Sequence, residues 1–456
     1  MVSVSMFCTL LSVGVAVAVV SPDLQALFDS LSLPNGFSIE LFASELSQPR
    51  AMDLSPNGTL FVGSLNNTVY AIRDGVTHVV ATNLNAPNGV AFHAASGDLY
   101  IGTLDAVLVV KNVEANLSAV HVPTVANAQF FDAASVWPVA DWHGFRYLRV
   151  RGDELFMTVG SPCNTPADPA DANSTCKCFW PGHGCSYPAD KVDYLGSLLK
   201  FPLPGLNNIT RVAHGIRNSV GVTWTPNGDL WFTDNGRDQW DLVVDGNDTM
   251  RGHSSRPPDE LNVVRRNSTP DQHYGFPQCF GVDLIDHQFN SHNTCEPFVG
   301  AVQPLGAHVA SLGLRYYNGS MFPPTFANSL IIAEHGSWDA DPPTGYRLSI
   351  VKLDADFKPV SYEPFVTGFL LTATGMDANA WARVADVQVL DDGSVLVTND
   401  KRGEIYRITY GTKTSPLLFE IGIAALVFLG VACLGIAIHS IRTRNTAAAK
   451  GQYSKI

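Results

Sequence analysis

The chain has 456 residues, 46% of them hydrophobic and 16% charged, and it contains 38 glycines and 28 prolines. Such a composition favours short strands joined by many turns over long surface helices. The formal net charge of −13 argues against a nucleic-acid-binding protein, because binding to phosphates without sequence preference needs a basic surface.

The chain begins with an apolar stretch. Residues 1–20 are mostly apolar and are followed by Ser21, Pro22 and Asp23, so we expect a signal peptide over residues 1–21. Its first residues lack Lys and Arg, which leaves the cleavage point open. Eight Asn-x-Ser/Thr sequons agree with export and predict a glycosylated extracellular or luminal domain. The predicted glycosylation sites are Asn57, Asn66, Asn116, Asn173, Asn208, Asn247, Asn267 and Asn318.

One short phrase recurs six times, a tight polar turn followed by an apolar, β-branched or aromatic run. It begins at Asn57, Ser96, Gly152, Asn227, Asn328 and Asp392. Such turns and runs are typical of antiparallel hairpins. Six copies predict an all-β fold, a six-bladed β-propeller over residues 33–410, because one small sheet needs neighbours to bury both faces. Several runs end in polar residues, so we expect a shared site where these strands end.

The gaps between the copies are uneven, which predicts two long loop insertions, over residues 161–193 and 237–304. Six cysteines lie in or near these insertions, and an even number in an oxidising compartment predicts three disulfides. They are Cys163, Cys176, Cys178, Cys185, Cys279 and Cys295. Cys279 with Cys295 is a plausible local pair, and the first four would then pair among themselves. A zinc site at the Cys-x-Cys is the alternative.

A second long apolar stretch lies near the end of the chain. Residues 417–438 are interrupted only by Glu420 and are long enough to cross a bilayer. Basic residues follow at 442, 444 and 450, which predicts a cytoplasmic tail over residues 439–456. We therefore expect a single-pass type I membrane protein, anchored with its large domain outside the cytoplasm. A buried core helix is the alternative.

Four stretches place polar side chains where the flanking chain is apolar. They are residues 141–146, residues 214–221, residues 233–238 with 257–262 and 274–277, and residues 333–338 with 381–387. Together with residues 36–39, 49–50, 84–91 and 403–408, they resemble the soluble, propeller-type quinoprotein sugar dehydrogenases. That group includes aldose (glucose) dehydrogenase, fungal pyranose dehydrogenase and the L-sorbosone-dehydrogenase-like proteins. The resemblance implies pyrroloquinoline quinone (PQQ) and Ca²⁺ bound at the open end of the propeller.

The resemblance also implies the roles of individual residues. His143 matches the general base, which takes the proton of a sugar hydroxyl while a hydride passes to PQQ. Arg217 and Asn218 would contact the quinone, and Arg383 would pair with one of the three PQQ carboxylates. His335 would donate to another carboxylate, and Trp338 would cover the ring.

For the metal, the resemblance implies that the backbone carbonyls of Gly236 and Arg237 hold a catalytic Ca²⁺, which polarises the reacting carbonyl of the quinone. Asp259, Glu260 and Tyr274 match a second, structural Ca²⁺ site. The reduced cofactor would pass its electrons to an external acceptor.

Two departures separate this chain from the bacterial glucose enzyme of the group. His335 stands near the position of a cofactor-binding Lys, and Ser161 stands where that enzyme has an Asp beside the base. Both features are closer to the fungal branch, so the sugar is left open. Two other functions are also left open: a non-catalytic extracellular binding propeller similar to hedgehog-interacting proteins, and a Ca²⁺-dependent lactonase.

Overall fold

The computed structural model describes residues 20–127, 143–165, 193–238, 240, 255–290, 293–338 and 340–411. The chain divides into two compact units, Met1–Thr409 and Tyr410–Ile456. All but two residues of the second unit lie outside the described ranges. The fold is therefore that of the first unit.

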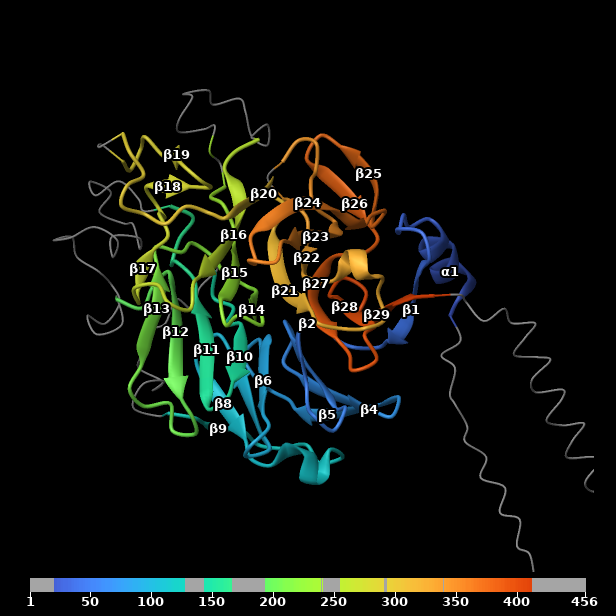
Figure 1. The fold of residues 1–456 in the computed structure, drawn as a ribbon. Coiled ribbons are helices and arrows are strands. Elements are labelled where there is room, and N and C mark those ends of the chain that lie inside the picture. Colours follow the sequence, from blue (N-terminus) through green and yellow to red (C-terminus); the bar gives the residue numbers. More distant parts are fainter. Residues whose placement is uncertain are drawn as a thin grey trace, which may run out of the picture. The chain divides into compact units, whose positions relative to one another are not determined.

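Within the described ranges, six sheets, each with four antiparallel strands and one of them with a fifth strand, succeed one another along the chain as blades (Figure 1). The innermost strands are β2 (Pro49–Leu54), β6 (Gly89–His93), β10 (Leu148–Arg151), β14 (Val222–Trp224), β21 (Ser311–Tyr317) and β27 (Val384–Val389). Each inner strand contacts the inner strand of the next blade, and β27 contacts β2, so the ring is closed. The predicted six-bladed all-β propeller is confirmed.

The recurring phrase of the sequence forms the second strand of every blade. These strands are β3 (Leu60–Ser64), β7 (Asp98–Gly102), β11 (Glu154–Val159), β15 (Leu230–Asp234), β22 (Ser329–Glu334) and β28 (Val395–Asn399). Five of the six are buried along their whole length, because they have a neighbouring strand on both sides and a neighbouring blade on both faces: β3, β7, β15, β22 and β28. This double burial explains their apolar runs.

The third strands are β4 (Val69–Arg73), β8 (Val107–Val110), β12 (Ser197–Pro202), β16 (Pro258–Val264), β23 (Arg347–Leu353) and β29 (Glu404–Tyr410). The outer strands are β5 (Val76–Ala81), β9 (Thr124–Val125), β13 (Thr210–His214), β20 (Gln303–Ala307), β24 (Pro359–Val366) and β1 (Phe37–Ala43). The last blade takes its outer strand from the start of the propeller, since β1 lies beside β29. This pairing joins the first and last parts of the ring.

Apolar and aromatic side chains fill the spaces between blades. Phe61 of the first blade stacks on Phe92 of the second, with ring centroids 5.4 Å apart. Phe156 of the third blade meets Trp224 of the fourth edge-on at 4.9 Å. Such contacts bury the faces that a single blade would leave exposed.

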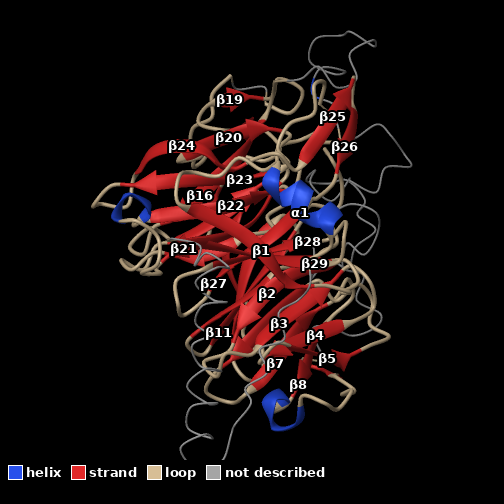
Figure 2. Cartoon of the chain, turned by 90° about the vertical axis from the view of Figure 1, so that its right-hand side faces the viewer, coloured by secondary structure: helices blue, strands red, loops and turns tan. Residues whose placement is uncertain are grey.

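Helices are short in the described part of the chain (Figure 2). The helix α1 (Pro22–Asp29) begins after Ser21, whose side chain caps it by accepting from the Leu24 backbone N–H at 3.2 Å. Phe28 packs against Tyr406 of the last blade, with ring centroids 5.1 Å apart. Two 3₁₀ turns lie at Val113–Asn116 and Pro324–Phe326. The helix thus precedes the predicted start of the propeller domain at residue 33 and packs onto the last blade.

Two small hairpins and one extra strand extend the blades. The strand β17 (Gln272–His273) runs parallel to β13. The hairpin of β18 (Cys279–Phe280) and β19 (Leu284–Ile285) lies in the second predicted insertion, and β25 (Leu370–Thr374) pairs with β26 (Asp377–Ala380). The insertion has a small apolar core of its own, formed by Trp240, Phe276 and Phe280.

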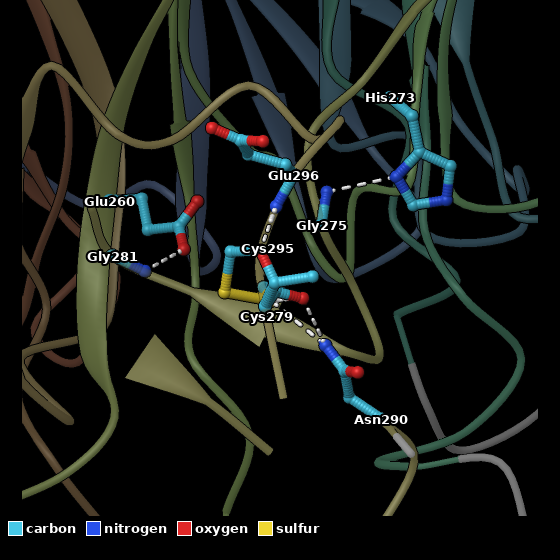
Figure 3. Close-up of a disulfide and its surroundings, with 9 residues drawn as sticks. Glu260, His273, Gly275, Cys279, Gly281, Asn290, Cys295 and Glu296 are labelled. Atoms are coloured by element: carbon cyan, nitrogen blue, oxygen red, sulfur yellow. Dashed lines mark hydrogen bonds between the residues drawn. A yellow bond between two sulfur atoms is a disulfide. The ribbon is translucent and has the colours of Figure 1, made fainter. Parts of the chain in front are cut away.

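The predicted disulfide between Cys279 and Cys295 is confirmed (Figure 3). Beside it, the Asn290 amide donates to the Thr294 carbonyl at 2.7 Å, which ties the same loop a second time. Cys163 is disulfide-bonded as well. Cys176, Cys178 and Cys185 lie outside the described residues, so the other predicted pairings stay predictions.

Removing the Cys279–Cys295 bond is expected to destabilise the insertion locally by about 3 kcal/mol, because it closes a loop of 16 residues. Hydrogen exchange of residues 276–290 in the Cys279→Ser/Cys295→Ser variant measures the effect, with residues 395–399 of β28 as the internal reference. Faster exchange confined to the insertion supports the prediction. Unchanged exchange there contradicts it.

The membrane prediction is wrong for the chain as described. Crossing a bilayer takes about 20 apolar residues in a helix, and α1 has 8. No helix in the described ranges is long and apolar enough to span a membrane. The single-pass type I arrangement is therefore withdrawn. The stretches 1–19 and 412–456, on which the predicted signal peptide, span and tail chiefly depended, lie outside the described residues.

Six of the eight predicted glycosylation sites fall in described segments, and all six asparagines are exposed: Asn57, Asn66, Asn116, Asn208, Asn267 and Asn318. Asn173 and Asn247 lie outside these segments. Glycosylation itself stays a prediction.

A polar network occupies the centre of the ring. The Asp386 carboxylate accepts from the Tyr147 hydroxyl at 2.9 Å and from the backbone N–H of Met52 at 2.8 Å. The guanidinium of Arg149 lies 3.3 Å from Asp386, and that of Arg315 lies 3.8 Å away. Because these residues come from β2, β10, β21 and β27, the network ties four inner strands together.

Candidate functional site

A cavity of about 580 Å³ opens at one end of the ring. Its walls come from the starts of the inner strands and the ends of the second strands, which lie at the same end because the two are antiparallel. The predicted site residues that line it are His143, Arg217, Asn218, Gly236, Asp259, His335, Trp338 and Arg383. These predicted residues therefore lie together at one end of the ring, although they come from four different blades, the third to the sixth.

The cavity also contains polar and aromatic residues that were not predicted as site residues. The principal ones are Gln48, Arg50, Phe145, Asn235, Asp238, His308, Asp400 and Lys401. Arg50 and Asp400 carried a signal in the sequence, since each is a charged residue at the edge of an apolar strand.

His143 lies just before β10 with a φ of 50°, in the left-handed region. Its Nδ1 is 3.0 Å from the Ser161 carbonyl oxygen and 3.0 Å from the Ser161 hydroxyl. A carbonyl can only accept, so Nδ1 carries the proton of the neutral ring and Nε2 is the basic nitrogen. The close approach requires a glycine at 160, because a Cβ there would lie 2.4 Å from the Cβ of His143.

Burial, and secondly the charge of Arg217, hold the pKa of His143 well below its ordinary value of 6.5. The imidazole is therefore neutral at neutral pH. A neutral ring with one nitrogen held by Ser161 has the electronic state that a general base needs.

Arg217 is almost completely buried in the cavity wall. Its guanidinium donates to the Asp238 carboxylate at 2.7 Å and to the Asn164 carbonyl at 3.0 Å. The side-chain amide of its neighbour Asn218 donates to Asn235 at 3.1 Å. Most donors of Arg217 are thus used within the protein, which fixes its orientation.

Arg383 is a different kind of cation. It donates to the backbone carbonyls of His335 at 3.2 Å and Gly336 at 2.6 Å, and its guanidinium lies 5.6 Å from the centre of the Tyr346 ring. Within the described residues it forms no ion pair with a carboxylate. Burial lowers the pKa of Arg383, because its charge is only partly compensated. It is the best candidate among the described cations for binding an anionic ligand.

His335 contacts a charged pair that joins the first and last blades. Its Nε2 lies 2.8 Å from Oδ2 of Asp400, and the same oxygen accepts from Arg50 at 2.8 Å. Burial is the main cause that lowers the pKa of His335, to about 4. Burial raises the pKa of Asp400, but His335 and then Arg50 outweigh it, so this carboxylate is ionised at neutral pH. Nε2 therefore carries the ring proton and donates a hydrogen bond to Asp400.

This geometry changes the role predicted for His335. With Nε2–H directed at Asp400, the remaining nitrogen of the neutral ring can only accept a hydrogen bond. Donation to a ligand carboxylate, as predicted, would require His335 to take up a second proton.

The predicted metal ligands separate into two groups. Gly236 lines the cavity, whereas the Arg237 side chain points into the insertion, where it pairs with Asp286 at 2.5 Å. That leaves their backbone, not the Arg237 side chain, as the part relevant to a metal. Asp259 lies beneath Gly236 and accepts from its N–H at 3.0 Å and from the Ser311 N–H at 2.7 Å.

The second predicted metal site is not assembled as a side-chain cluster. Glu260 accepts from the Gly281 N–H at 2.6 Å (Figure 3), and the Tyr274 hydroxyl donates to the Val263 carbonyl at 2.8 Å. In the described ranges no three His, Cys, Asp or Glu side chains are placed to hold a metal ion. Burial, and then the charge of Asp234, raise the pKa of Glu260 to about 8.

The cavity fits PQQ in size and in charge. Its volume lies within the range of about 300–1,000 Å³ that is common for small-molecule sites. A ligand with three carboxylates needs buried cations, and Arg383 is available, while Arg50 and Arg217 stand at the wall already paired with Asp400 and Asp238. For Ca²⁺ the fit rests on oxygen donors around Gly236 and Asp259, which suit a hard cation.

Comparison with known proteins finds a family model that matches part of the chain. Residues 206–411 match the TrAA12-like family model. The predicted resemblance to the PQQ-dependent sugar dehydrogenases is confirmed by this match and by the relatives described next.

An uncharacterised protein from Borreliella burgdorferi is 29% identical over 392 residues, which span 84% of this chain and 91% of that protein. A PQQ-dependent pyranose dehydrogenase from Coprinopsis cinerea is 25% identical over 240 residues, or 45% of this chain. The match spans only 32% of that enzyme's length, about a third.

Solved structures of three related proteins have the same fold. A calcium structure of the family AA12 enzyme from Trichoderma reesei superposes with a TM-score of 0.65 at 19% identity, covering 84% of this chain and 97% of the other. The holo form of the PQQ domain of Coprinopsis cinerea pyranose dehydrogenase gives 0.62 at 17%, with coverages of 83% and 97%. PQQ-bound aldose sugar dehydrogenase from Streptomyces coelicolor gives 0.53 at 15%, with coverages of 83% and 99%. At these identities the likeness establishes the propeller fold.

Proposed function

We propose that this protein oxidises a hydroxyl group of a sugar, with PQQ and Ca²⁺ in the cavity and His143 as the general base. The observation that carries the proposal is the convergence of His143, Arg383 and Gly236 on one cavity, although they lie far apart in the sequence. The PQQ-dependent pyranose dehydrogenase among the relatives, and the PQQ-bound and calcium structures among the structural neighbours, support it.

The bound cofactor would supply an ortho-quinone that accepts a hydride, with Ca²⁺ as a Lewis acid beside it. The protein's own contribution begins with His143, which takes the proton of the sugar hydroxyl at Nε2. Ser161 keeps the opposite nitrogen protonated and the ring oriented. On an anomeric hydroxyl this oxidation gives a lactone.

Binding and orientation fall to the other cavity residues. Arg383 would pair with a carboxylate of PQQ, and Arg217 and Asn218 would form the wall against the quinone. Trp338, which is 53% exposed, stands at the mouth, where an aromatic face can cover a planar ring. An electron acceptor outside this chain would reoxidise the cofactor.

The test is reconstitution of the purified protein with Ca²⁺ and PQQ, followed by reduction of an electron-accepting dye with a panel of aldoses and pyranoses. Dye reduction that depends on all three additions is expected. Absence of both turnover and any PQQ absorbance change would overturn the proposal. Hydrolysis of a lactone with Ca²⁺ alone would favour the lactonase, and PQQ-independent capture of a protein ligand would favour the binding propeller.

Replacing Arg383 by glutamine is expected to weaken PQQ binding about 10- to 100-fold, because a hydrogen bond to a charged partner is worth about 1.5–3 kcal/mol. Absorbance titration with PQQ at fixed Ca²⁺ measures this affinity. Arg402→Gln is the matched control, since Arg402 pairs with Glu404 at 2.8 Å outside the cavity wall. Equal affinities of the two variants would contradict the role of Arg383.

A further inference from the structure

The cluster around His335 combines three potential cations with one carboxylate. Asp400 contacts both His335 and Arg50 through the same oxygen, at 2.8 Å each. Arg383 donates to the His335 backbone carbonyl at 3.2 Å and has no carboxylate bonded to it in the described chain. Arg50 and Asp400 are both more than 90% buried, and all four side chains line the cavity.

Burial is the main cause that keeps His335 neutral, and the charges of Arg383 and Arg50 act in the same direction. Arg50 and Arg383 are permanently charged, and Asp400 compensates only one of them. A proton on His335 would add a third positive charge at a buried position, where repulsion is weakly screened. An anion bound beside Arg383 would reverse this balance, because it supplies the negative charge that the cluster lacks.

We propose that the cavity binds its carboxylate ligand together with one proton, which His335 takes up, and that Asp400 is the positioning residue that makes this uptake possible. Asp400 holds one ring nitrogen, so the added proton must go to Nδ1, and the ring becomes a donor on both sides. The inference rests on the proposed function, because it takes PQQ as the carboxylate ligand. It reconciles the neutral His335 of the structure with the donor role predicted from the sequence.

The groups that face His335 come from three other segments. Arg50 comes from β2, Asp400 follows β28, and Arg383 precedes β27, while Lys401 lines the same cavity. Only Asp400 among the groups acting on His335 favours its charged form, and Arg383 and Arg50 oppose it. Since the anion raises the proton affinity of His335, binding is tighter at low pH and weakens as the pH rises.

The experiment measures PQQ affinity of the full chain with saturating Ca²⁺ between about pH 5 and pH 8, where the ligand's carboxylates stay ionised. The dissociation constant should rise by up to about tenfold per pH unit, until the pH exceeds the pKa of His335 in the complex. Calorimetric titration at one pH in PIPES and in Tris should give enthalpies whose difference corresponds to uptake of about one proton. Neither readout needs turnover.

His335→Gln keeps a donor toward Asp400 but cannot take up a proton, so the uptake should fall by about one proton. Asp400→Asn retains the imidazole and removes the carboxylate that supports its charge, so the uptake should fall here as well. His308→Gln is the matched control, because His308 lines the same cavity but bonds the Arg256 carbonyl at 3.0 Å. The PQQ dissociation constant of this variant should change with pH as it does in the parent protein.

A PQQ dissociation constant that does not change with pH would overturn this inference and leave the proposed function intact. The same holds if the pH dependence of the dissociation constant persists in His335→Gln. Failure of PQQ to bind at any pH would overturn both. If His308→Gln lost the pH dependence of PQQ affinity as fully as His335→Gln, the proton uptake could not be assigned to His335, and the inference would be refuted.

Discussion

Turnover of the reconstituted protein should fall about 10²- to 10⁴-fold when His143 is replaced by asparagine, the usual contribution of a general base. Asparagine suits the position because His143 has a φ of 50°, and asparagine adopts left-handed backbone more readily than most residues. Its amide can also donate to the Ser161 carbonyl, as Nδ1 does in the parent protein. The basic nitrogen is therefore the main loss.

Steady-state kinetics with the dye assay, together with PQQ titration, measure the two consequences separately. Turnover should fall while PQQ affinity stays near the parent value, since His143 is not assigned to the carboxylates. His93→Asn is the control, because His93 is also buried but does not line the cavity. Its Nε2 lies 3.1 Å from the Asp153 carboxylate. Unchanged turnover in His143→Asn would rule out His143 as the base.

The pH dependence of the parent protein gives an independent check. The base must be neutral to accept a proton, and burial holds the pKa of His143 well below 6.5. Values of kcat/KM should therefore stay constant as the pH falls from about 8 through 6.5, and decline only in more acidic solution. A decline centred near 6.5 would indicate a solvated histidine and would contradict the buried geometry.

The largest effect on stability is expected from Asp386→Asn in the central network. The substitution leaves the buried guanidinium groups of Arg149 and Arg315 without their shared carboxylate. Breaking such a buried ionic arrangement typically costs about 3–5 kcal/mol, because an uncompensated charge remains in the interior. The amide would also present a donor to either the Met52 N–H or the Tyr147 hydroxyl, both of which donate to Asp386 in the parent protein.

The midpoint and slope of urea unfolding, followed by circular dichroism, test this expectation. The control is Glu154→Gln, since the Glu154–Lys200 pair at 2.7 Å is partly exposed and should contribute less than about 1 kcal/mol. Equal midpoints for the two variants would show that the network does not hold the inner strands together. A changed slope would indicate that the variant no longer unfolds as one unit.

Sequence patterns predicted the blades well because the signal for a hairpin is local. A polar turn and the strand that follows it are set by neighbouring residues, so the six phrases beginning at Asn57 and its equivalents each became a second strand. The disulfide between Cys279 and Cys295 was predicted correctly for the same reason, because the two residues are only 16 positions apart. By contrast, the short helix α1 left no clear signal, since its stability depends on burying Leu24 and Phe28 against a distant blade.

For the site, the sequence by itself determined which residue types were present, and the family resemblance singled out His143, Arg217 and Arg383. Only the tertiary structure decided how these residues are connected. Arg50 and Asp400 are 350 positions apart, and Asp400 and His335 are 65 apart, yet closure of the ring brings all three into contact. The physical reason is that charge state depends on burial and on neighbours in space. The structure therefore makes His335 neutral, with Nε2–H donating to Asp400 and only the other ring nitrogen left to accept. It also directs the Arg237 side chain away from the cavity toward Asp286.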